Sequence, residues 1–223
     1  MIVTVIVIVL VASIASTMLF EINQEGNSTQ APPQFCTSDF INLNKIEQIS
    51  VFRSFEGHDY SDSYEHNLSM KHYFTPYPNV TSVEIYSPCK GSISKIFQEQ
   101  NGVGNQVQIQ VADHPEYTVI IFHLNVTDGL AVGNSVEAGQ QIGTASQEQG
   151  TDIAVSKSIF FANELFSYFD VMTDSVFAHY QARGVTDRSE MIRSAEMAQE
   201  MQKTYSFNSV PPYTEEWVTL NPS

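Results

Sequence analysis

The chain has 223 residues, enough to bury one core of ordinary domain size but hardly two. Its 10 Lys and Arg against 25 Asp and Glu give a formal net charge of -15. Such a surface repels phosphate backbones and anionic lipid headgroups, which argues against nucleic acid as a partner. It suits cations, cationic partners or a salty exterior, but an ordinary soluble protein carries the same charge, so charge alone indicates no function.

The first segment of the chain is strongly apolar. Residues 2–20 contain no charged side chain and are dominated by Val, Ile, Leu and Ala, so as a helix they would reach across most of a bilayer. We interpret them as an export segment that is either a cleaved signal peptide or a retained anchor. Ser13 and Ala15 supply small residues for cleavage, but no basic residue precedes the run, which favours the anchor. The folded part is expected to be extracytoplasmic, either membrane-anchored or secreted.

Changes in composition divide the rest of the chain. Residues 21–40 are rich in Asn, Gln, Ser and Thr and contain a proline pair, as a linker does. The expected parts are a signal peptide or anchor, a linker, a β domain, a helical extension and a tail, at residues 1–20, 21–40, 41–158, 159–203 and 204–223.

The central part has the periodicity of strands. Between residues 83 and 144 short apolar alternations are interrupted by glycine and asparagine, which predicts an antiparallel β domain. Residues 107–111 alternate strictly, so one face of that strand is expected to be buried. Residues 119–122 are apolar without interruption, which suits a strand covered on both faces.

After residue 158 the pattern becomes helical. Apolar residues from Phe160 to Tyr180 recur at helical or near-helical intervals, and Gly184 follows as a stop. Asp187 and Glu190 have the spacing of a capping box ahead of a second apolar stripe. The sequence therefore predicts two C-terminal α-helices and an N-terminal apolar helix beside a mainly β domain.

The cysteines and the glycosylation sequons bear on an extracytoplasmic location. Cys36 and Cys89 are the only cysteines, and in an exported chain we predict that they form a disulfide, which would stabilise the fold by about 4 kcal/mol on a chain-entropy estimate. Asn-x-Ser/Thr sequons, which predict glycosylation if the cell makes it, begin at Asn27, Asn67, Asn79 and Asn125.

His58 and Asp62 are candidate metal ligands. Residues four apart lie on one side of a helix or a strand, so an imidazole and a carboxylate at these positions can reach one metal ion. A hydrolytic zinc site needs three protein ligands and an open position for water. The question is therefore whether the chain supplies a third ligand.

Several motifs in order resemble one known family. They are Gly57–Asp62, Ser87–Ile93, Asn101–Val107, Phe122–Leu124 and Val132–Gly143. This succession, from about Gly57 to Val155, resembles the lysostaphin or LytM-type zinc endopeptidases that cut peptidoglycan cross-bridges. The resemblance implies an antiparallel β-sandwich or barrel-sandwich hybrid domain.

The resemblance also implies the roles of individual residues. His58 and Asp62 match two zinc ligands of the family, and His123 matches an auxiliary catalytic histidine. Where the family has His-x-His, this chain has Asp152-Ile153-Ala154, so Asp152 replaces the other catalytic histidine and Ala154 replaces the third ligand. Positions two apart share one face of a strand, so Asp152 and Ala154 both face the site. Alanine cannot bind a metal.

Other side chains could supply the missing ligand. His66, His72 and Asp152 are the candidates, and Asp152 would serve only if its strand slid by two residues. His72 lies in an aromatic stretch with Tyr64, Tyr73, Phe74 and Tyr77, where we favour packing over sugar stacking. Zinc therefore remains a possible cofactor with an incomplete ligand set.

The sequence leaves three functional hypotheses open. The preferred one is an exported, degenerate member of the family that is not catalytic and that binds or regulates a glycan, peptide or protein of the cell envelope. The second is an active zinc endopeptidase with a replaced third ligand. The third is a structural envelope subunit whose terminal helices and acidic face make the contacts. Fold resemblance alone does not choose among them.

Overall fold

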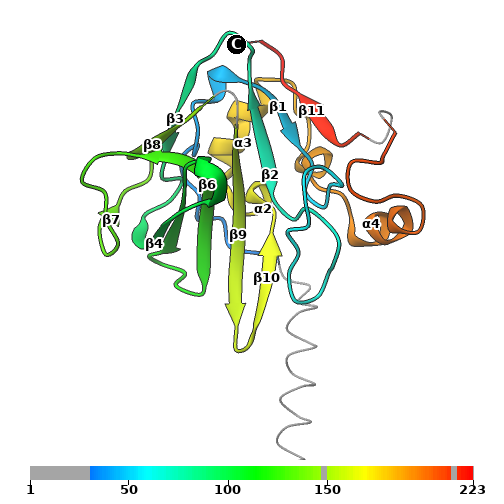
Figure 1. The fold of residues 1–223 in the computed structure, drawn as a ribbon, viewed down its shortest axis with the longest axis horizontal. Helices are drawn as coiled ribbons and strands as arrows, with labels where there is room; N and C mark the ends of the chain where they lie inside the picture. Colours follow the sequence, from blue (N-terminus) through cyan, green and yellow to red (C-terminus); the bar gives the residue numbers. More distant parts are fainter. Residues whose placement is uncertain (1–30, 147–149, 212–214, 223) are drawn as a thin grey trace, which may run out of the picture. The chain divides into compact units, whose positions relative to one another are not determined.

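The strands of the fold are antiparallel and most belong to one curved sheet. The computed structural model describes residues 31–146, 150–211 and 215–222. The strands are β1 (Ile46–Ser50), β2 (His72–Pro76), β3 (Ser82–Tyr86), β4 (Gly91–Gln98), β5 (Asn105–Val111), β6 (Tyr117–Val126), β7 (Ser135–Val136), β8 (Gln141–Ser146), β9 (Thr151–Ile159), β10 (Ala162–Phe166) and β11 (Trp217–Thr219). Their order is β11-β1-β2-β9-β6-β5-β4-β7, while β10 pairs with β9 and β8 pairs with β6 and β3 (Figure 1). The predicted mainly β, antiparallel class is confirmed.

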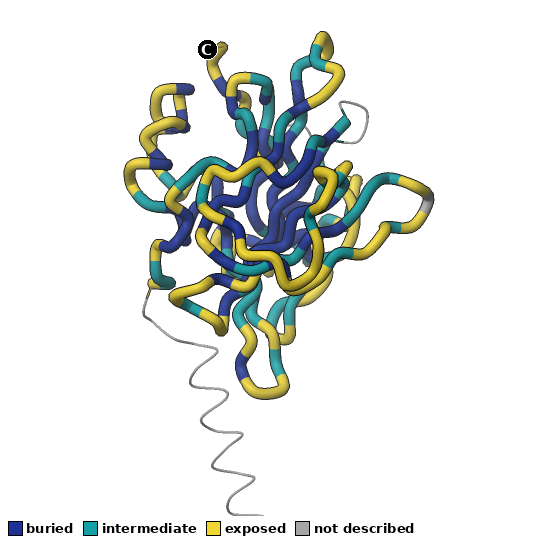
Figure 2. The backbone as a smooth tube through the Cα atoms, turned by 90° about the vertical axis from the view of Figure 1, so that its left-hand side faces the viewer, coloured by how far each residue is buried: buried dark blue, intermediate teal, exposed yellow. Residues whose placement is uncertain are grey.

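The two central strands bury their side chains as their sequences predict. In β5 the apolar residues are buried and the glutamines between them are more exposed. In β6 the run from Val119 to Phe122 is buried throughout, because Val119 and Ile121 enter the main core while Ile120 and Phe122 face a second small cluster. Figure 2 shows buried residues concentrated where the strands meet and exposed residues along the loops. The second cluster marks the face on which the site lies.

The α-helices lie between β10 and β11 in the sequence and are short. They are α2 (Tyr168–Val171), α3 (Asp174–Gln181) and α4 (Ala195–Gln202), with 3-10 turns η1 (Leu43–Lys45), η2 (Gln100–Gly102) and η3 (Arg188–Met191). The helix expected to begin at Phe160 is wrong for residues 160–166, because Phe160 and Phe161 form a tight turn and the next residues pair with β9 as β10. The predicted capping box of Asp187 and Glu190 is present, but it caps η3, and α4 begins after Ser194.

The C-terminal segment returns to the sheet and is fixed there by buried charges. The strand β11 pairs with β1. Glu216, just before it, forms a buried ion pair with Arg193 at 2.7 Å and accepts the backbone N–H of Phe55. Residues 32–223 form one compact unit, so the segments predicted as body, helical extension and tail fold together.

The predicted disulfide between Cys36 and Cys89 is wrong, since both residues are buried free thiols. Burial raises the pKa of the Cys36 thiol well above its ordinary value, and the hydrogen bond with Cys89 and its charge raise it further. The thiolate that disulfide exchange requires is therefore suppressed. Backbone hydrogen bonds hold this segment instead, from Cys36 N to Val171 O and from Thr37 N to Pro88 O.

The predicted N-terminal apolar helix, residues 2–20, lies outside the described residues, as does the sequon at Asn27. Within the described part of the chain, no helix has the length and apolar character that crossing a membrane requires.

Candidate functional site

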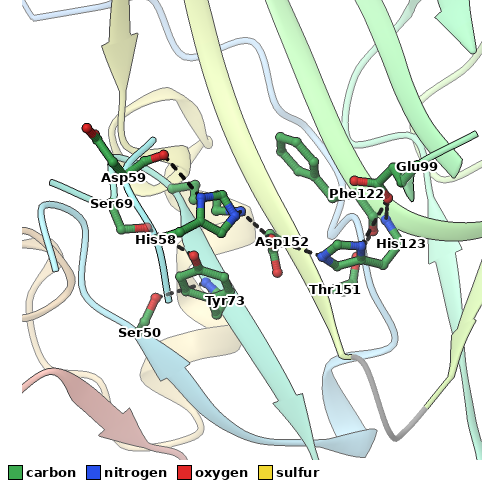
Figure 3. Close-up of polar contacts among 11 residues, drawn as sticks. Ser50, His58, Asp59, Ser69, Tyr73, Glu99, Phe122, His123, Thr151 and Asp152 are labelled. Carbon is green, nitrogen blue, oxygen red and sulfur yellow. Dashed lines mark hydrogen bonds and ion pairs between the residues drawn. The ribbon is translucent and has the colours of Figure 1, made fainter. Parts of the chain in front are cut away.

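A bulge in β6 positions the histidine that the resemblance implicates. In the pairing of β5 with β6, Val107 lies opposite Ile121 and Asn105 opposite Leu124, so Phe122 and His123 together face one residue. The extra residue, His123, has a φ of +63°, a left-handed conformation that costs a side-chain-bearing residue about 1–3 kcal/mol. Such bulges redirect side chains at functional sites, and this one directs His123 towards β9 (Figure 3).

The bulge has its own support. The backbone N–H of His123 donates to Oε2 of Glu99 at 2.7 Å, which replaces the strand partner that the bulge removes. Gly104 passes close beneath, and a Cβ there would lie 2.8 Å from the carbonyl carbon of His123. A larger residue at position 104 would therefore displace the bulge.

A buried lysine occupies the centre of the site. Lys71 precedes β2, and only 2% of its side chain is exposed. Its Nζ lies 2.6 Å from Oδ2 of Asp152, which is equally buried, and 3.5 Å from Nε2 of His58. The aromatic rings around the ammonium are those of Tyr73, Phe122 and Tyr60, with centroids at 4.6, 4.7 and 5.3 Å. These contacts stabilise a cation, because each ring presents the negative face of its π system.

His123 continues the row of charges. Its Nε2 lies 3.4 Å from Oδ2 of Asp152, and its Nδ1 lies 3.0 Å from Oε2 of Glu99, the latter as a charge contact without hydrogen-bond geometry. We call the residues His58, Lys71, Asp152, His123 and Glu99 the polar row; Figure 3 shows His58, Asp152, His123 and Glu99 lying in that order.

The charges of the polar row decide the protonation of His123. Burial lowers its pKa, but the hydrogen bond to Asp152, the charge of Asp152 and the charge of Glu99 together outweigh burial and the charge of Lys71, so the pKa of His123 is raised. The row thus favours the imidazolium form. An imidazolium has no free lone pair to accept a proton or to bind a metal.

The position of the missing third ligand is filled by apolar packing. Asp152 and Ala154 do share a face of β9, as predicted. Ala154 packs with Ile120 and Phe122, and the ring of Tyr60 lies edge-on to Phe122 with centroids 5.4 Å apart. Burial, and then the charge of Asp152, raise the pKa of Tyr60 to about 12, so its hydroxyl stays neutral.

Both carboxylate oxygens of Asp62 accept hydrogen bonds from backbone N–H groups. Its Oδ1 accepts the N–H groups of Tyr64 and Glu65, both at 2.8 Å, and its Oδ2 accepts the N–H of Leu165 at 2.9 Å. Leu165 belongs to β10, so Asp62 covers the outer edge of that strand. The carboxylate therefore stabilises a loop and a strand edge, and the structure does not bring it together with His58.

Replacing Asp62 with alanine is expected to lower the free energy of unfolding by about 1–2 kcal/mol, because three backbone N–H groups lose their acceptor. The measurement is urea denaturation, with Asp59→Ala as the control, since Asp59 is an exposed carboxylate in the same loop. The same variants should leave metal content unchanged. A loss of metal in Asp62→Ala alone would show that Asp62 is a ligand.

The other histidine candidates lie apart from the polar row. His72 is completely buried on the opposite face of β2 from Lys71, where its Nδ1 donates to the carbonyl of Ser50 at 2.8 Å and its Nε2 lies 2.7 Å from the hydroxyl of Ser167. It packs against Phe169, which confirms packing as its role. His66 is exposed in the loop between β1 and β2.

Three members of this site were not predicted from the sequence. Lys71 and Glu99 lie outside the motifs of the family resemblance, and Tyr60 is an unspecified position within the first motif. Lys71 shares its side of the strand with Tyr73 and Thr75, which are only half-buried, so the alternation of β2 gave no signal that the ammonium would be buried. Glu99 and Tyr60 are positioned by the conformation of loops, which the periodicity of apolar residues in the sequence does not predict.

Zinc, the metal implied by the resemblance, does not fit these residues. The donor closest to the site centre, Asp152, is neutralised by the ammonium of Lys71, Asp62 is occupied by backbone N–H groups, and Ala154 offers no lone pair. Across residues 31–146, 150–211 and 215–222, no group of three or more His, Cys, Asp or Glu side chains converges as a metal site. A cavity of about 640 Å³ lies elsewhere, lined by Asp39, Tyr86, His179 and Arg183 among others.

The fold and the polar row together describe an antiparallel β domain whose site is built around the buried ammonium of Lys71. The model of Peptidase family M23 matches residues 72–162, which span β2 to the start of β10. This match confirms the resemblance to the lysostaphin and LytM-type family, so residues 72–162 are an M23-family segment. The matched segment contains His123, Asp152 and Ala154 but not His58 or Asp62.

Solved structures of similar fold share little sequence with the chain. Lysostaphin, studied in solution, is 20% identical with a TM-score of 0.32, and the match covers 40% of this chain and 36% of that one. A putative glycyl-glycine endopeptidase LytM from Ruminococcus gnavus is 14% identical with a TM-score of 0.38, covering 45% and 44%. A chain of the SpoIIQ-SpoIIIAH pore forming complex is 13% identical with a TM-score of 0.43, covering 67% and 98%. No curated protein matches the sequence.

Proposed function

We propose that the chain is a non-hydrolytic M23-type protein of the cell envelope, attached to a membrane through residues 2–20, that binds an envelope glycan, peptide or protein. The observation that carries this proposal is the ion pair of Lys71 with Asp152 at the centre of the site. The ammonium of Lys71 supplies the positive charge at the centre of the site and, unlike a metal ion, is part of the chain.

The chemistry of the polar row supports binding over hydrolysis. Metal-dependent hydrolysis needs three converging protein ligands and a base that takes a proton from water. Here Lys71 pairs with the nearest carboxylate, and His123 lies between two carboxylates that favour its protonated form. His58 is exposed and His123 is partly exposed, so both imidazoles of the row can contact a ligand.

An exterior location is part of the proposal. Residues 2–20 are uncharged, and the acceptor residues Asn67, Asn79 and Asn125 are exposed, as glycan attachment requires. The sequence predicted a linker at 21–40, a β domain at 41–158, a helical extension at 159–203 and a tail at 204–223. Residues 32–40 of that linker belong to the folded unit, where Phe35, Cys36 and Phe40 lie in the core.

The deciding experiment measures metal and activity together. The full chain, purified in detergent and dialysed against zinc sulfate, is expected to retain far less than one zinc per molecule and to release no fragments from purified peptidoglycan. It is expected to sediment with the peptidoglycan, and His58→Ala with His123→Ala should weaken this sedimentation. Val132→Ala, an exposed change away from the polar row, is the control.

Other results would favour the other hypotheses. Stoichiometric zinc with chelator-sensitive cleavage would replace this proposal with an active endopeptidase. If the protein holds no zinc and the double variant sediments with peptidoglycan as well as the wild type does, the structural-subunit hypothesis remains.

A further inference from the structure

The β9–β10 hairpin ends in two exposed phenylalanines. Phe160 and Phe161 form its two-residue turn, with Ile159 paired to Ala162. Their side chains are 81% and 102% exposed, the highest values among the large apolar residues that the structure describes. Figure 1 shows the hairpin projecting beyond the neighbouring end of β6. Apolar side chains this exposed indicate a surface that is covered in the working protein.

The turn holds Phe160 in an unfavourable backbone conformation. Phe160 has a φ of +48°, the left-handed region that this position of a tight hairpin normally gives to glycine or asparagine. A phenylalanine there is strained, and because Phe160 is 81% exposed, packing does little to offset the strain. A strained residue that persists without packing points to a role at that position.

The charges around the tip suit a neutral apolar surface. Residues 158–163 contain no charged side chain, and Lys157 and Glu164 lie opposite each other at the base of the tip. The chain as a whole carries a net charge of -15. The hairpin is thus an uncharged projection from an acidic body, which allows it to reach a bilayer while the acidic surface stays in water.

The chain enters the folded unit at the end of the sheet from which the β9–β10 hairpin projects. The ring of Phe35 packs on Tyr117 with centroids 5.2 Å apart, and Tyr117 lies opposite Lys157 in the pairing of β6 with β9. Only ten residues separate Phe20, the end of the apolar segment, from Ala31, where the described chain begins. Even fully extended they span at most about 40 Å. A membrane holding residues 2–20 is therefore within reach of the hairpin.

From these observations we propose that Phe160 and Phe161 insert into the interface of the bilayer that holds residues 2–20, as a second membrane contact. Two phenylalanines offer about 400 Å² of apolar surface, roughly half of what each side of a stable protein interface buries. The same two rings at the tip of a narrow hairpin fit the boundary between headgroups and acyl chains. This inference rests on the membrane attachment in the proposed function.

The test places a fluorophore beside the tip. Cys36 and Cys89 are buried, so a cysteine introduced at exposed Ser158 can be labelled selectively with bimane in the full chain. In phosphatidylcholine vesicles with brominated acyl chains, we expect the label to be quenched. Phe160→Ser with Phe161→Ser should abolish the quenching, since each loss lowers the insertion equilibrium by about tenfold or more.

Controls separate the tip from the anchor. A bimane at Val132→Cys, exposed in the turn before β7, should not be quenched. Flotation of the full chain with the vesicles reports attachment through residues 2–20 and should be unchanged by the serine substitutions. A chain that floats without quenching overturns the insertion alone, whereas a chain that does not float overturns the attachment and the insertion with it. Protection of the label only by added envelope proteins would assign the tip to a protein partner and also overturn the proposal.

Discussion

Replacing Lys71 with methionine is expected to lower the free energy of unfolding by about 3–5 kcal/mol. Methionine preserves most of the side-chain volume, so the loss comes from charge rather than from a cavity. The carboxylate of Asp152, only 2% exposed, loses the ammonium 2.6 Å away and becomes an unpaired buried charge apart from its contact with His123. Urea denaturation at neutral pH measures the effect.

A double variant distinguishes this explanation from lost packing. Lys71→Met with Asp152→Leu removes both charges and should recover most of the stability, because an apolar pair of similar volume often equals or exceeds a buried ion pair. Lys95→Met is the matched control, since the Nζ of Lys95 also lies over an aromatic ring, that of Phe97 at 4.8 Å, but both residues are exposed. Its cost should stay below about 1 kcal/mol. A double variant as unstable as Lys71→Met alone would contradict the ion-pair explanation.

The strand architecture could be predicted because it depends on local periodicity. The alternation over residues 107–111 and the unbroken apolar run over 119–122 match the observed burial of β5 and β6. The same reasoning was wrong at residues 160–166, where spaced phenylalanines imitate a helix although two of them form a turn and a third, Phe166, lies in a strand. Apolar spacing alone does not separate a short strand from a helix.

The site was predictable only as far as strand geometry controls it. Asp152 and Ala154 share a face because they are two apart in β9, and this followed from the sequence. The identity of the central cation did not, because Lys71 reaches Asp152 across β2 and β9, 81 residues apart. Asp62 illustrates the opposite error: spacing four from His58 suggested a shared metal, but backbone N–H groups from its own loop and from β10 hold both oxygens.

Acid is expected to destabilise the fold through His72, by about 3 kcal/mol between pH 6.5 and pH 4. Burial lowers the pKa of His72 to about 4, opposed by its hydrogen bond to the Ser50 carbonyl. In the unfolded chain the same imidazole has a pKa of about 6.5, so between these values the unfolded state binds a proton that the folded state does not. Stability from this group is complete above pH 6.5, falls with the pH, and is lost at about pH 4, below which His72 contributes no further slope.

A variant at His72 removes the pH dependence but not the packing constraint. His72→Gln keeps an amide donor for the Ser50 carbonyl, and we expect it to cost about 1–3 kcal/mol at pH 7 while flattening the loss of stability between pH 6.5 and pH 4. His66→Gln, at an exposed histidine, should keep the wild-type slope. Urea denaturation at half-unit pH steps measures both. Ser167 contacts His72 and also caps α2 by accepting the N–H of Phe169. Protonation of the His72 ring is therefore expected to loosen α2 together with β2. Hydrogen exchange at pH 5 should then be faster in both elements. An unchanged acid slope in His72→Gln would assign the pH dependence to another group.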